Sequence, residues 1–283
     1  MVAQILWLAS YPKSGNTWLR AFLVNYLLGA DKPAPLDVLG RHVLGDMDAW
    51  PYERILGGPV VDRPVEEIYG VRSQAHRLLA EQRPGIVPVK THVQVRRFAG
   101  VPTITPEVTF GAIYVARNPL DVVISFADHY GVTVDQAIEA SGAPVHFAGG
   151  VGPVIPQDLG SWSGHVRSWT RARGLYRLVL RYEDMLADPL GAFGRVVAFL
   201  RHRADTERLE KAVRFSSFKE LSTQESAAGF AERSQNSRRF FRKGRAGGWR
   251  KALSTRQVSR VIALHGPVMG EHGYLDQRGK AVA

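Results

Sequence analysis

The chain has 283 residues, of which 45% are hydrophobic and 22% charged, a composition typical of a soluble globular protein that can bury a sizeable core. It contains no cysteine, which excludes disulfides, thiolate catalysis and Cys-bound zinc or iron–sulfur centres. The net charge of +11 suits a polyanionic small molecule or a nucleic acid as ligand. No zinc-finger or basic-zipper pattern accompanies the dense basic run at 238–251, so the charge alone does not distinguish these two classes of ligand.

A strand, a short polar loop and a helix open the chain. Residues 5–9 are an almost continuous apolar run, which predicts a strand buried on both faces. Apolar residues then recur at helical spacing, so a helix is predicted to begin near Thr17. The loop at 11–18 carries Lys13 and directs backbone N–H groups and the positive end of a helix dipole toward one place. This arrangement favours a phosphate or a similar oxyanion as ligand.

The loop differs from the standard P-loop. A P-loop places its Lys after the second Gly, whereas Lys13 precedes Gly15. The plain alternative to an anion site is a polar turn with a solvated lysine.

A second strand is predicted after a stretch of loops and short helices at 29–75. It covers 86–90, where Pro88 argues against a central position in the sheet. It ends in Lys-Thr-His at 90–92, and a Lys and a His two residues apart at the carboxyl end of a parallel strand point toward the crevice where open α/β sheets bind ligands. A lone His is more often structural, so this motif is weak by itself.

Residues 110–116 predict the clearest strand after the first. A helix follows, with Asn118 as its N-cap and Pro119 as its first residue. Arg117 therefore stands beside a helix N-terminus, where a guanidinium can bind a phosphate through two hydrogen bonds. A surface ion pair is the plain alternative for Arg117. Ser125 lies two turns further along the helix.

The middle of the chain predicts a long loop and two further elements before the C-terminal part. Residues 141–160 are rich in Gly and Pro and predict a long loop of the kind that forms lids or binding loops. A short amphipathic helix at 160–169 follows, with its aromatic side chains expected in the core. Residues 175–182 predict a fourth strand, which ends at Tyr182, and Asp188 is expected to open the next helix.

The segment at 240–250 is the most distinctive of the C-terminal half. Arg242, Lys243 and the N–H groups of a turn that contains Gly244 are expected to bind a dianionic phosphate. A basic solvated loop or a nucleic-acid patch is the alternative. No composition break marks a domain boundary, so one domain is predicted over 1–283.

Four segments of this chain, at 11–18, 90–92, 114–125 and 240–250, resemble in sequence and in order the signatures of the sulfotransferases that use 3′-phosphoadenosine 5′-phosphosulfate (PAPS). The resemblance implies a P-loop-like α/β fold with a central, mostly parallel sheet flanked by helices on both faces. It also implies a PAPS-dependent sulfotransferase that acts on a hydroxyl or amine of a small-molecule acceptor, releases 3′,5′-adenosine bisphosphate (PAP) and needs no metal. Without this resemblance, the spacing of the strands, loops and motifs indicates only a nucleotide- or phosphate-binding α/β enzyme.

The resemblance also assigns roles to residues. The catalytic residues would be His92 as general base, Lys13 at the leaving phosphate and Lys90 near the transferred sulfuryl group. The donor's 5′-phosphate is assigned to Lys13, Ser14, Gly15, Asn16 and Thr17. Its adenine is assigned to Trp18, Tyr182, Ser216 and Phe218. Its 3′-phosphate is assigned to Arg117, Ser125, Phe240, Arg242, Lys243 and Gly244.

Two other functions stay open. A kinase-like phosphotransferase would need a metal-binding Asp at a strand end and affinity for ATP, whereas a nucleic-acid-binding protein would not need the ordered set of phosphate sites. The sequence does not set the acceptor. Six side chains either line an aromatic pocket for a phenol or a hydrophobic alcohol or belong to the core: Phe22, Tyr26, Phe126, Tyr130, His146 and Phe147.

The start of the chain lacks a basic segment, and its apolar run is too short for a signal peptide or a membrane anchor. A cytoplasmic location without a membrane span is therefore predicted. The stretch at 251–260 departs from the dimer motif of the vertebrate cytosolic sulfotransferases, because Arg256 and Arg260 stand at its Val and Glu positions. The oligomeric state is left open.

Overall fold

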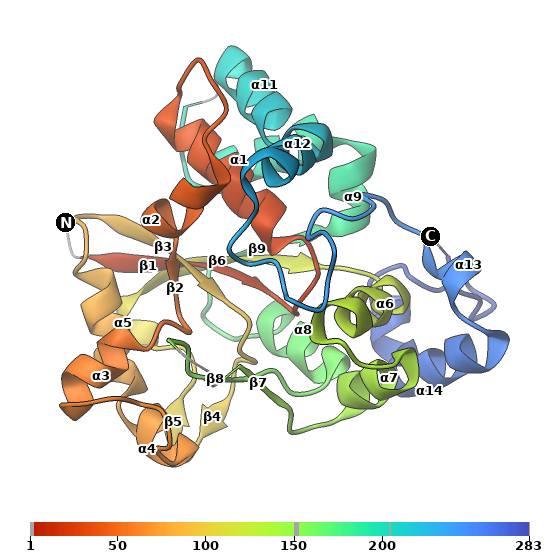
Figure 1. Ribbon diagram of the computed structural model, residues 1–283, viewed down its shortest axis with the longest axis horizontal. Helices are drawn as coiled ribbons and strands as arrows, with labels where there is room; N and C mark the ends of the chain where they lie inside the picture. Colours follow the sequence, from red (N-terminus) through yellow and green to blue (C-terminus); the bar gives the residue numbers. More distant parts are fainter. Residues whose placement is uncertain (1–2, 150–152, 204, 283) are drawn as a thin grey trace. The chain divides into compact units, whose positions relative to one another are not determined.

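The structure, a computed structural model, describes residues 3–149, 153–203 and 205–282 (Figure 1). The chain groups into two compact units, each assembled from three stretches of sequence. The first unit comprises Met1–Tyr11, Val43–Tyr114 and Ala143–Val179. The second unit comprises Pro12–His42, Val115–Gly142 and Leu180–Ala283. The single domain expected over 1–283 stays a prediction.

The first unit holds most of the central sheet and several helices. Its elements in chain order are β1 (Gln4–Ser10), β2 (Leu44–Gly45), α3 (Trp50–Leu56), α4 (Val65–Gly70), α5 (Arg72–Ala80), β3 (Ile86–Thr91), β4 (Arg97–Phe98), β5 (Val101–Pro102), the 3-10 helix η2 (Pro106–Val108), β6 (Thr109–Ala116), β7 (Phe147–Gly149), β8 (Pro156–Asp158), α8 (Trp162–Thr170) and β9 (Arg177–Arg181). The last two residues of β6 and of β9 belong to the second unit.

The sheet has the strand order β2-β3-β1-β6-β9, and β3 runs parallel to both β1 and β2. Helix α5 packs against β1 and β3, with the ring of Trp7 in β1 lying 4.9 Å from that of His76 in α5. Helix α8 packs against β6, where Tyr114 stacks on Trp169 at a centroid distance of 6.1 Å. The α/β class, with a mostly parallel sheet flanked by helices, is therefore confirmed.

The position of Pro88 differs from the expectation. Strand β3 lies inside the sheet, between β2 and β1. Proline is tolerated there because β2 is only two residues long and pairs with Val89 and Lys90, so it does not extend to Pro88. The argument against a central position was wrong for this reason.

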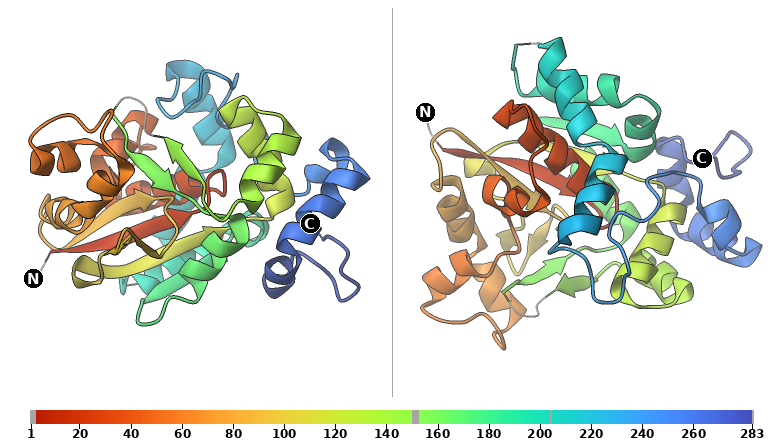
Figure 2. Two further views of the ribbon diagram at one scale, coloured as in Figure 1. Left: turned by 90° about the horizontal axis from the view of Figure 1, so that it is seen from below. Right: turned by 45° about the horizontal axis from the view of Figure 1, so that its top comes forward.

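The long loop predicted at 141–160 was also partly wrong. Strands β7 and β8 pair there as a short antiparallel hairpin, in which Phe147 is opposite Asp158 (Figure 2). Phe147 packs against Phe98 and Tyr69 at ring distances of 5.5 and 6.2 Å, a tertiary contact that no local pattern announces. The part of the predicted loop at 150–152 lies outside the described residues.

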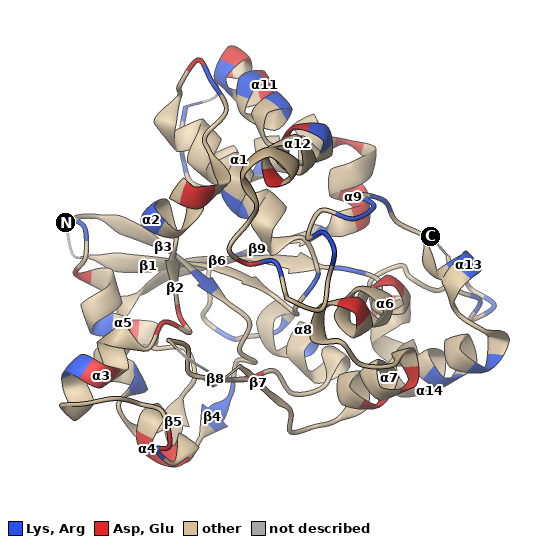
Figure 3. Ribbon diagram, in the orientation of Figure 1, with Lys and Arg blue, Asp and Glu red and all other residues tan. Residues whose placement is uncertain are grey.

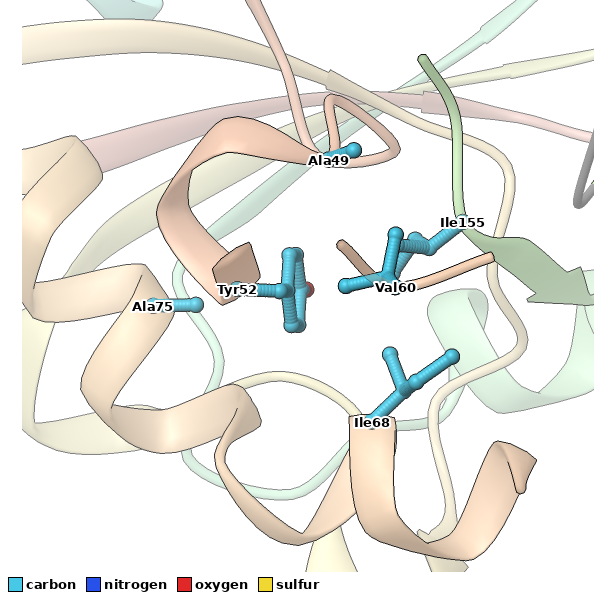
Figure 4. Packing of buried hydrophobic residues seen from close by; sticks show 6 residues of the cluster. All are labelled: Ala49, Tyr52, Val60, Ile68, Ala75 and Ile155. Carbon is cyan, nitrogen blue, oxygen red and sulfur yellow. The ribbon is translucent and has the colours of Figure 1, made fainter. Parts of the chain in front are cut away.

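A satellite core in the first unit joins α3, α4 and α5 to the residue just before β8 (Figure 4). Tyr52, Ala75 and Ile155 are fully buried in it. Burying one large apolar side chain contributes roughly 1.5–3 kcal/mol, so this cluster stabilises the part at 49–75 of the stretch predicted as loops and short helices. Its members are Ala49, Tyr52, Val60, Ile68, Ala75 and Ile155.

The second unit is mainly helical. Its elements in chain order are α1 (Asn16–Leu28), the 3-10 helix η1 (Leu36–Val38), α2 (Leu39–His42), α6 (Pro119–Tyr130), α7 (Val134–Gly142), α9 (Tyr182–Ala187), α10 (Pro189–Phe199), α11 (Thr206–Phe215), α12 (Phe218–Ala228), α13 (Trp249–Ala252) and α14 (Thr255–Glu271). Asn118 caps α6 by accepting a hydrogen bond from the N–H of Leu120, as predicted. Strand β9 is shorter than predicted, because Tyr182 already begins α9.

Three of the six aromatic candidates for an acceptor pocket are buried in the second unit. Phe22 is fully buried and stacks on Phe193 at 4.1 Å, and Tyr26 is 1% exposed. Phe126 is 6% exposed and packs on Tyr130 at 4.2 Å. Phe22 and Tyr26 therefore belong to the core. Over the described ranges, no helix has both the length and the apolar character needed to cross a bilayer.

Candidate functional site

The loop between β1 and α1 is shaped for close approach of its backbone to other groups. Gly15 precedes α1 with a φ of +102°, and a Cβ at this position would lie 2.6 Å from Cδ2 of Tyr182. Only glycine fits there without displacing the tyrosine ring. Because Gly15 has no side chain to cap the helix, the positive end of α1 is left to attract an anion. Lys13 has a φ of +66°, a strained conformation of the kind found in ligand-binding loops.

Ser14 in this loop and Thr17 in the first turn of α1 carry hydroxyl groups. Ser14 is fully buried, and its Oγ has no hydrogen-bond partner among the described residues. An unsatisfied buried hydroxyl costs about 1–3 kcal/mol, which a ligand oxygen would remove. Thr17 is held differently, since its Oγ1 accepts a hydrogen bond of 2.9 Å from Arg20, whose guanidinium pairs with Glu232 at 2.7 Å.

Arg117 joins three parts of the second unit. Its guanidinium donates to the carbonyl of Lys13 at 2.9 Å and to that of Arg245 at 3.4 Å, and it lies 4.3 Å from the ring centroid of Tyr182. Burial raises the pKa of Tyr182, so its ring stays neutral beneath the guanidinium. The strand end, the loop and the C-terminal basic segment thus converge on one cation.

Lys13 lies against the C-terminal segment as well. Its Nζ is 4.1 Å from the ring centroid of Phe240, within the range of a cation–π interaction, and 3.4 Å from Nδ1 of His129. Phe240 was assigned to the site only through the family signature. The structure gives it a direct contact with the predicted catalytic lysine.

The segment at 237–249, which leads into α13, is rich in Lys and Arg (Figure 3). Glu225 of α12 is buried, and its two carboxylate oxygens accept the N–H groups of Phe240 and Phe241 at 2.6 and 2.8 Å. The backbone that leads to the predicted phosphate clamp is therefore fixed by a buried acid of another helix.

Two acids of α6 complete the anchoring. Asp121 accepts the N–H groups of Gly247 and Trp249 at 2.7 and 3.0 Å. Asp128 accepts the hydroxyl of Ser237 at 2.7 Å and pairs with Arg242 at 2.7 Å. The guanidinium of Arg242 is thus held in an ion pair. Lys243, like Arg242, is exposed.

The residues assigned to adenine lie in different environments. Phe218 is 38% exposed and packs against Gly244, where an added Cβ would overlap its ring. Trp18 lies edge-on to Tyr182 at 6.0 Å. Ser216 is fully buried and donates its hydroxyl to the carbonyl of Ala212 at 2.9 Å. Phe218 is the member of this group with the most accessible ring.

Ser125 is half-buried on α6 and Asn16 begins α1. All fifteen residues assigned to the donor belong to the second unit. Four of them, Lys13, Arg117, Tyr182 and Phe240, are joined by direct contacts of their side chains or backbone.

His92 and Lys90 belong to the first unit, at and just after the end of β3. Nδ1 of His92 lies 2.7 Å from the carbonyl oxygen of Ser10. A carbonyl can only accept a hydrogen bond, so Nδ1 carries the proton. In the neutral ring Nε2 is then the nitrogen that accepts a proton, which is what a general base requires.

A buried polar network holds Thr91, the residue between Lys90 and His92. Thr91 donates its hydroxyl to Asp46 at 2.6 Å, and Asp46 forms an ion pair with Arg72 and a 3.0 Å hydrogen bond with His76. Burial alone would raise the pKa of Asp46, but Arg72, His76 and Thr91 together lower it to about 2. Asp46 is therefore a fixed anion at the end of β3.

The sequence patterns did not assign Asp46, Asp121, Asp128 or Glu225 to the site. Their partners lie far away in the chain: 126 residues separate Asp121 from Gly247. A buried acid that serves a distant backbone has no local signature. Across the described ranges, no three His, Cys, Asp or Glu residues lie together in a metal-binding arrangement.

A parallel sheet that carries an anion-binding loop between a strand and a helix is typical of α/β enzymes that bind nucleotides. The family model of the sulfotransferase domain matches residues 4–273, so this chain belongs to the sulfotransferase family. It is a PAPS-dependent sulfotransferase, and the resemblance seen in its motifs is confirmed.

Relatives are similar over most of their length. Flavonol 3-sulfotransferase of Flaveria bidentis is 24% identical, with 95% of this chain and 82% of the relative covered. Sulfotransferase 1 family member D1 of Rattus norvegicus is 28% identical, with 89% and 79% covered.

Two solved structures share the fold. Mouse sulfotransferase SULT7A1 complexed with PAP has a TM-score of 0.61 and 21% identity, with 98% of this chain and 87% of that chain covered. Retinol dehydratase in complex with retinol and PAP has a TM-score of 0.64 and 19% identity, with 95% and 82% covered.

Proposed function

We propose that this enzyme transfers the sulfuryl group of PAPS to a hydroxyl, or to an amine, of a small-molecule acceptor, with His92 as the base and the donor held by the fifteen residues assigned to it. The observation that carries this proposal is the convergence of the loop, Tyr182 and the C-terminal segment on Arg117. Arg117 itself, Lys13 of the loop and Arg245 of the C-terminal segment are cationic residues from three stretches far apart in sequence. That is the chemistry that two separate phosphates require.

The residues present suit the donor. The unsatisfied hydroxyl of Ser14 and the uncapped N-terminal end of α1 favour the 5′-phosphosulfate. Arg117 with Arg242 and Lys243 favours the 3′-phosphate, and Phe218 presents an accessible ring to adenine. When bound, PAPS supplies an activated sulfuryl group with PAP as the leaving group.

The proposed chemistry uses few side chains. As the acceptor oxygen forms its bond to sulfur and the bond from sulfur to the 5′-phosphate breaks, Nε2 of His92 takes the acceptor proton. Lys13 offsets the negative charge that grows on the leaving phosphate, and Lys90 offsets charge on the sulfuryl oxygens. The hydrogen bond from Nδ1 to Ser10 keeps His92 in the tautomer that this step needs.

A phenol or a hydrophobic alcohol is the acceptor class that we favour. Tyr130, His146 and Phe147 are half-buried and stay candidates for contact with it, whereas Phe22 and Tyr26 are occupied in the core. Among the relatives and solved structures, one is named for a flavonol and one is complexed with retinol. A cytoplasmic location also stays part of the proposal.

Isothermal titration with PAP, with ATP in the presence and absence of Mg²⁺, and with duplex DNA tests the proposal. PAP should bind much more tightly than ATP and without Mg²⁺, because the C-terminal segment supplies ligands for a 3′-phosphate. Tighter binding of ATP that depends on Mg²⁺ would favour a kinase-like phosphotransferase. Preferred binding of DNA would favour a nucleic-acid-binding protein.

The role of His92 is tested by His92→Ala. Removal of a base that acts only as the reaction proceeds should lower kcat by at least about a hundredfold and leave PAP affinity unchanged. The loss should be smaller for a nitrophenol that is already ionised, because no proton then needs a base. Wild-type turnover of the variant on an un-ionised alcohol would make His92 structural.

A further inference from the structure

Helix α8 contacts the backbone that carries the proposed base. His165 of this helix is fully buried, and its Nε2 lies 2.9 Å from the carbonyl oxygen of His92. On its other side, Nδ1 lies 2.9 Å from the hydroxyl of Tyr114 in β6. A single imidazole therefore spans the space between β6 and the peptide of His92.

The partners fix the state of His165. Because the carbonyl of His92 can only accept, Nε2 of His165 carries the proton, and Nδ1 accepts the hydroxyl proton of Tyr114. Burial lowers the pKa of His165 to about 3, so the ring stays neutral in this tautomer at any physiological pH. The hydroxyl of Tyr114 also has a backbone hydrogen bond with Tyr11, which orients it.

Two further residues of α8, Ser168 and Trp169, also bind the loop that follows β3. The indole N–H of Trp169 donates to the carbonyl of Val93 at 2.9 Å, and the hydroxyl of Ser168 accepts the N–H of Val95 at 3.0 Å. Trp169 is fully buried. Three side chains of α8 thus bind three successive parts of the loop that follows β3.

We infer that His165 is a positioning residue, which holds the main chain of His92 so that the base keeps its orientation, with Trp169 and Ser168 as further supports. The inference rests on the proposed function in one respect, because its effect on turnover requires His92 to be the base. A small displacement of a catalytic group lowers the rate by up to about a hundredfold. His165 itself touches no reactant and exchanges no proton.

A matched pair of variants separates the two hydrogen bonds of His165. His165→Gln places an amide N–H near the position of Nε2 and keeps a donor for the carbonyl of His92, whereas His165→Asn is too short to reach it. His265→Gln is the control, since His265 is also a buried histidine, bonded to Ser141 at 3.1 Å in the second unit. The measurements are turnover on an un-ionised alcohol and on an ionised nitrophenol, PAP affinity, and the Nδ1–H signal of His92 in long-range ¹H–¹⁵N spectra.

For His165→Asn we expect turnover on the alcohol to fall roughly ten- to hundredfold. The loss on nitrophenol should be smaller, PAP affinity should be unchanged and the Nδ1–H signal of His92 should be lost or shifted. His165→Gln should restore most of the turnover and the signal, and His265→Gln should alter neither. An Asn variant with a wild-type signal and wild-type turnover would overturn the inference, as would equal losses on both acceptors together with weaker PAP binding.

Failure of the proposed function gives a different pattern. If His92→Ala keeps its turnover while His165→Asn still displaces the His92 signal, the base is wrong and the positioning role stands. Should neither His165 variant fold, Trp169→Phe, which removes one N–H from the carbonyl of Val93, takes their place under the same criteria.

Discussion

Arg117 holds the carbonyl of Lys13 and covers the ring of Tyr182, so its guanidinium is already oriented before a nucleotide arrives. A preoriented cation loses less side-chain entropy when it binds phosphate than a free surface arginine does. Arg117 is therefore preoriented for the role in nucleotide selection that we propose for it.

Arg117→Ala should weaken PAP binding far more than 5′-AMP binding. A charge-assisted hydrogen bond to phosphate contributes about 1.5–3 kcal/mol, so PAP affinity should fall about ten- to hundredfold. Calorimetric titration of both nucleotides measures the difference. Arg238→Ala, which removes an exposed charge from the same basic run, is the control and should change both affinities little. An equal loss of both nucleotides in Arg117→Ala would contradict its assignment to the 3′-phosphate.

Among the elements, helices α6 and α12 hold the backbone of the C-terminal segment at 237–249. Glu225 of α12 and Asp121 of α6 each accept two backbone N–H groups of this segment. An irregular backbone keeps a defined shape only when such groups are paired. These acids therefore fix the backbone from which the side chains of Arg242 and Lys243 extend.

Glu225→Gln should destabilise the protein and weaken PAP binding. The amide keeps one acceptor oxygen and turns an N–H₂ group toward a backbone donor, which should lower the free energy of unfolding by roughly 1–3 kcal/mol. Denaturant unfolding and PAP titration measure the two effects. Glu139→Gln, an exposed acid on α7, should change neither. If Glu225→Gln unfolds and binds PAP like the wild type, the segment is held by other contacts.

The elements also show what the sequence can predict. Strands β1, β3 and β6 and helix α6 were predicted because an apolar run or a cap is a local signal. Strands β2, β4, β5, β7 and β8 are two or three residues long, and they form only because a distant partner pairs with them. The family signatures located the motif residues in the same way, but the buried acids that hold these motifs have no pattern of their own.

For the molecule as a whole, buried neutral histidines make stability depend on pH. Burial lowers the pKa of His165 from 6.5 to about 3 and that of His265 from 6.5 to about 4. Below pH 6.5 the unfolded chain binds protons at these rings, and the folded chain does not until the pH approaches the lower values. The free energy of unfolding therefore falls as the pH falls through this window.

Each of these two histidines should cost about 2 kcal/mol between pH 8 and pH 5. Urea unfolding at the two pH values measures the total pH dependence, and His265→Gln should reduce that difference by about 2 kcal/mol. An identical pH dependence in His265→Gln and the wild type would contradict the burial argument. Asp46 acts in a lower window, because its stabilisation is complete above about pH 4 and is lost as the pH falls toward 2.

The order in which the donor residues occur in the chain has a consequence for biosynthesis. The anion loop at 13–18 leaves the ribosome before α6 and α12, and the segment at 240–249, which these two helices anchor, follows later still. Under the proposed assignment, cellular nucleotide can make all of its contacts with the nascent enzyme only after the segment at 240–249 has been translated. A chain that stops before residue 240 would contain the loop for the 5′-phosphate and Arg117, but it would lack Arg242 and Lys243, the other two cations assigned to the 3′-phosphate.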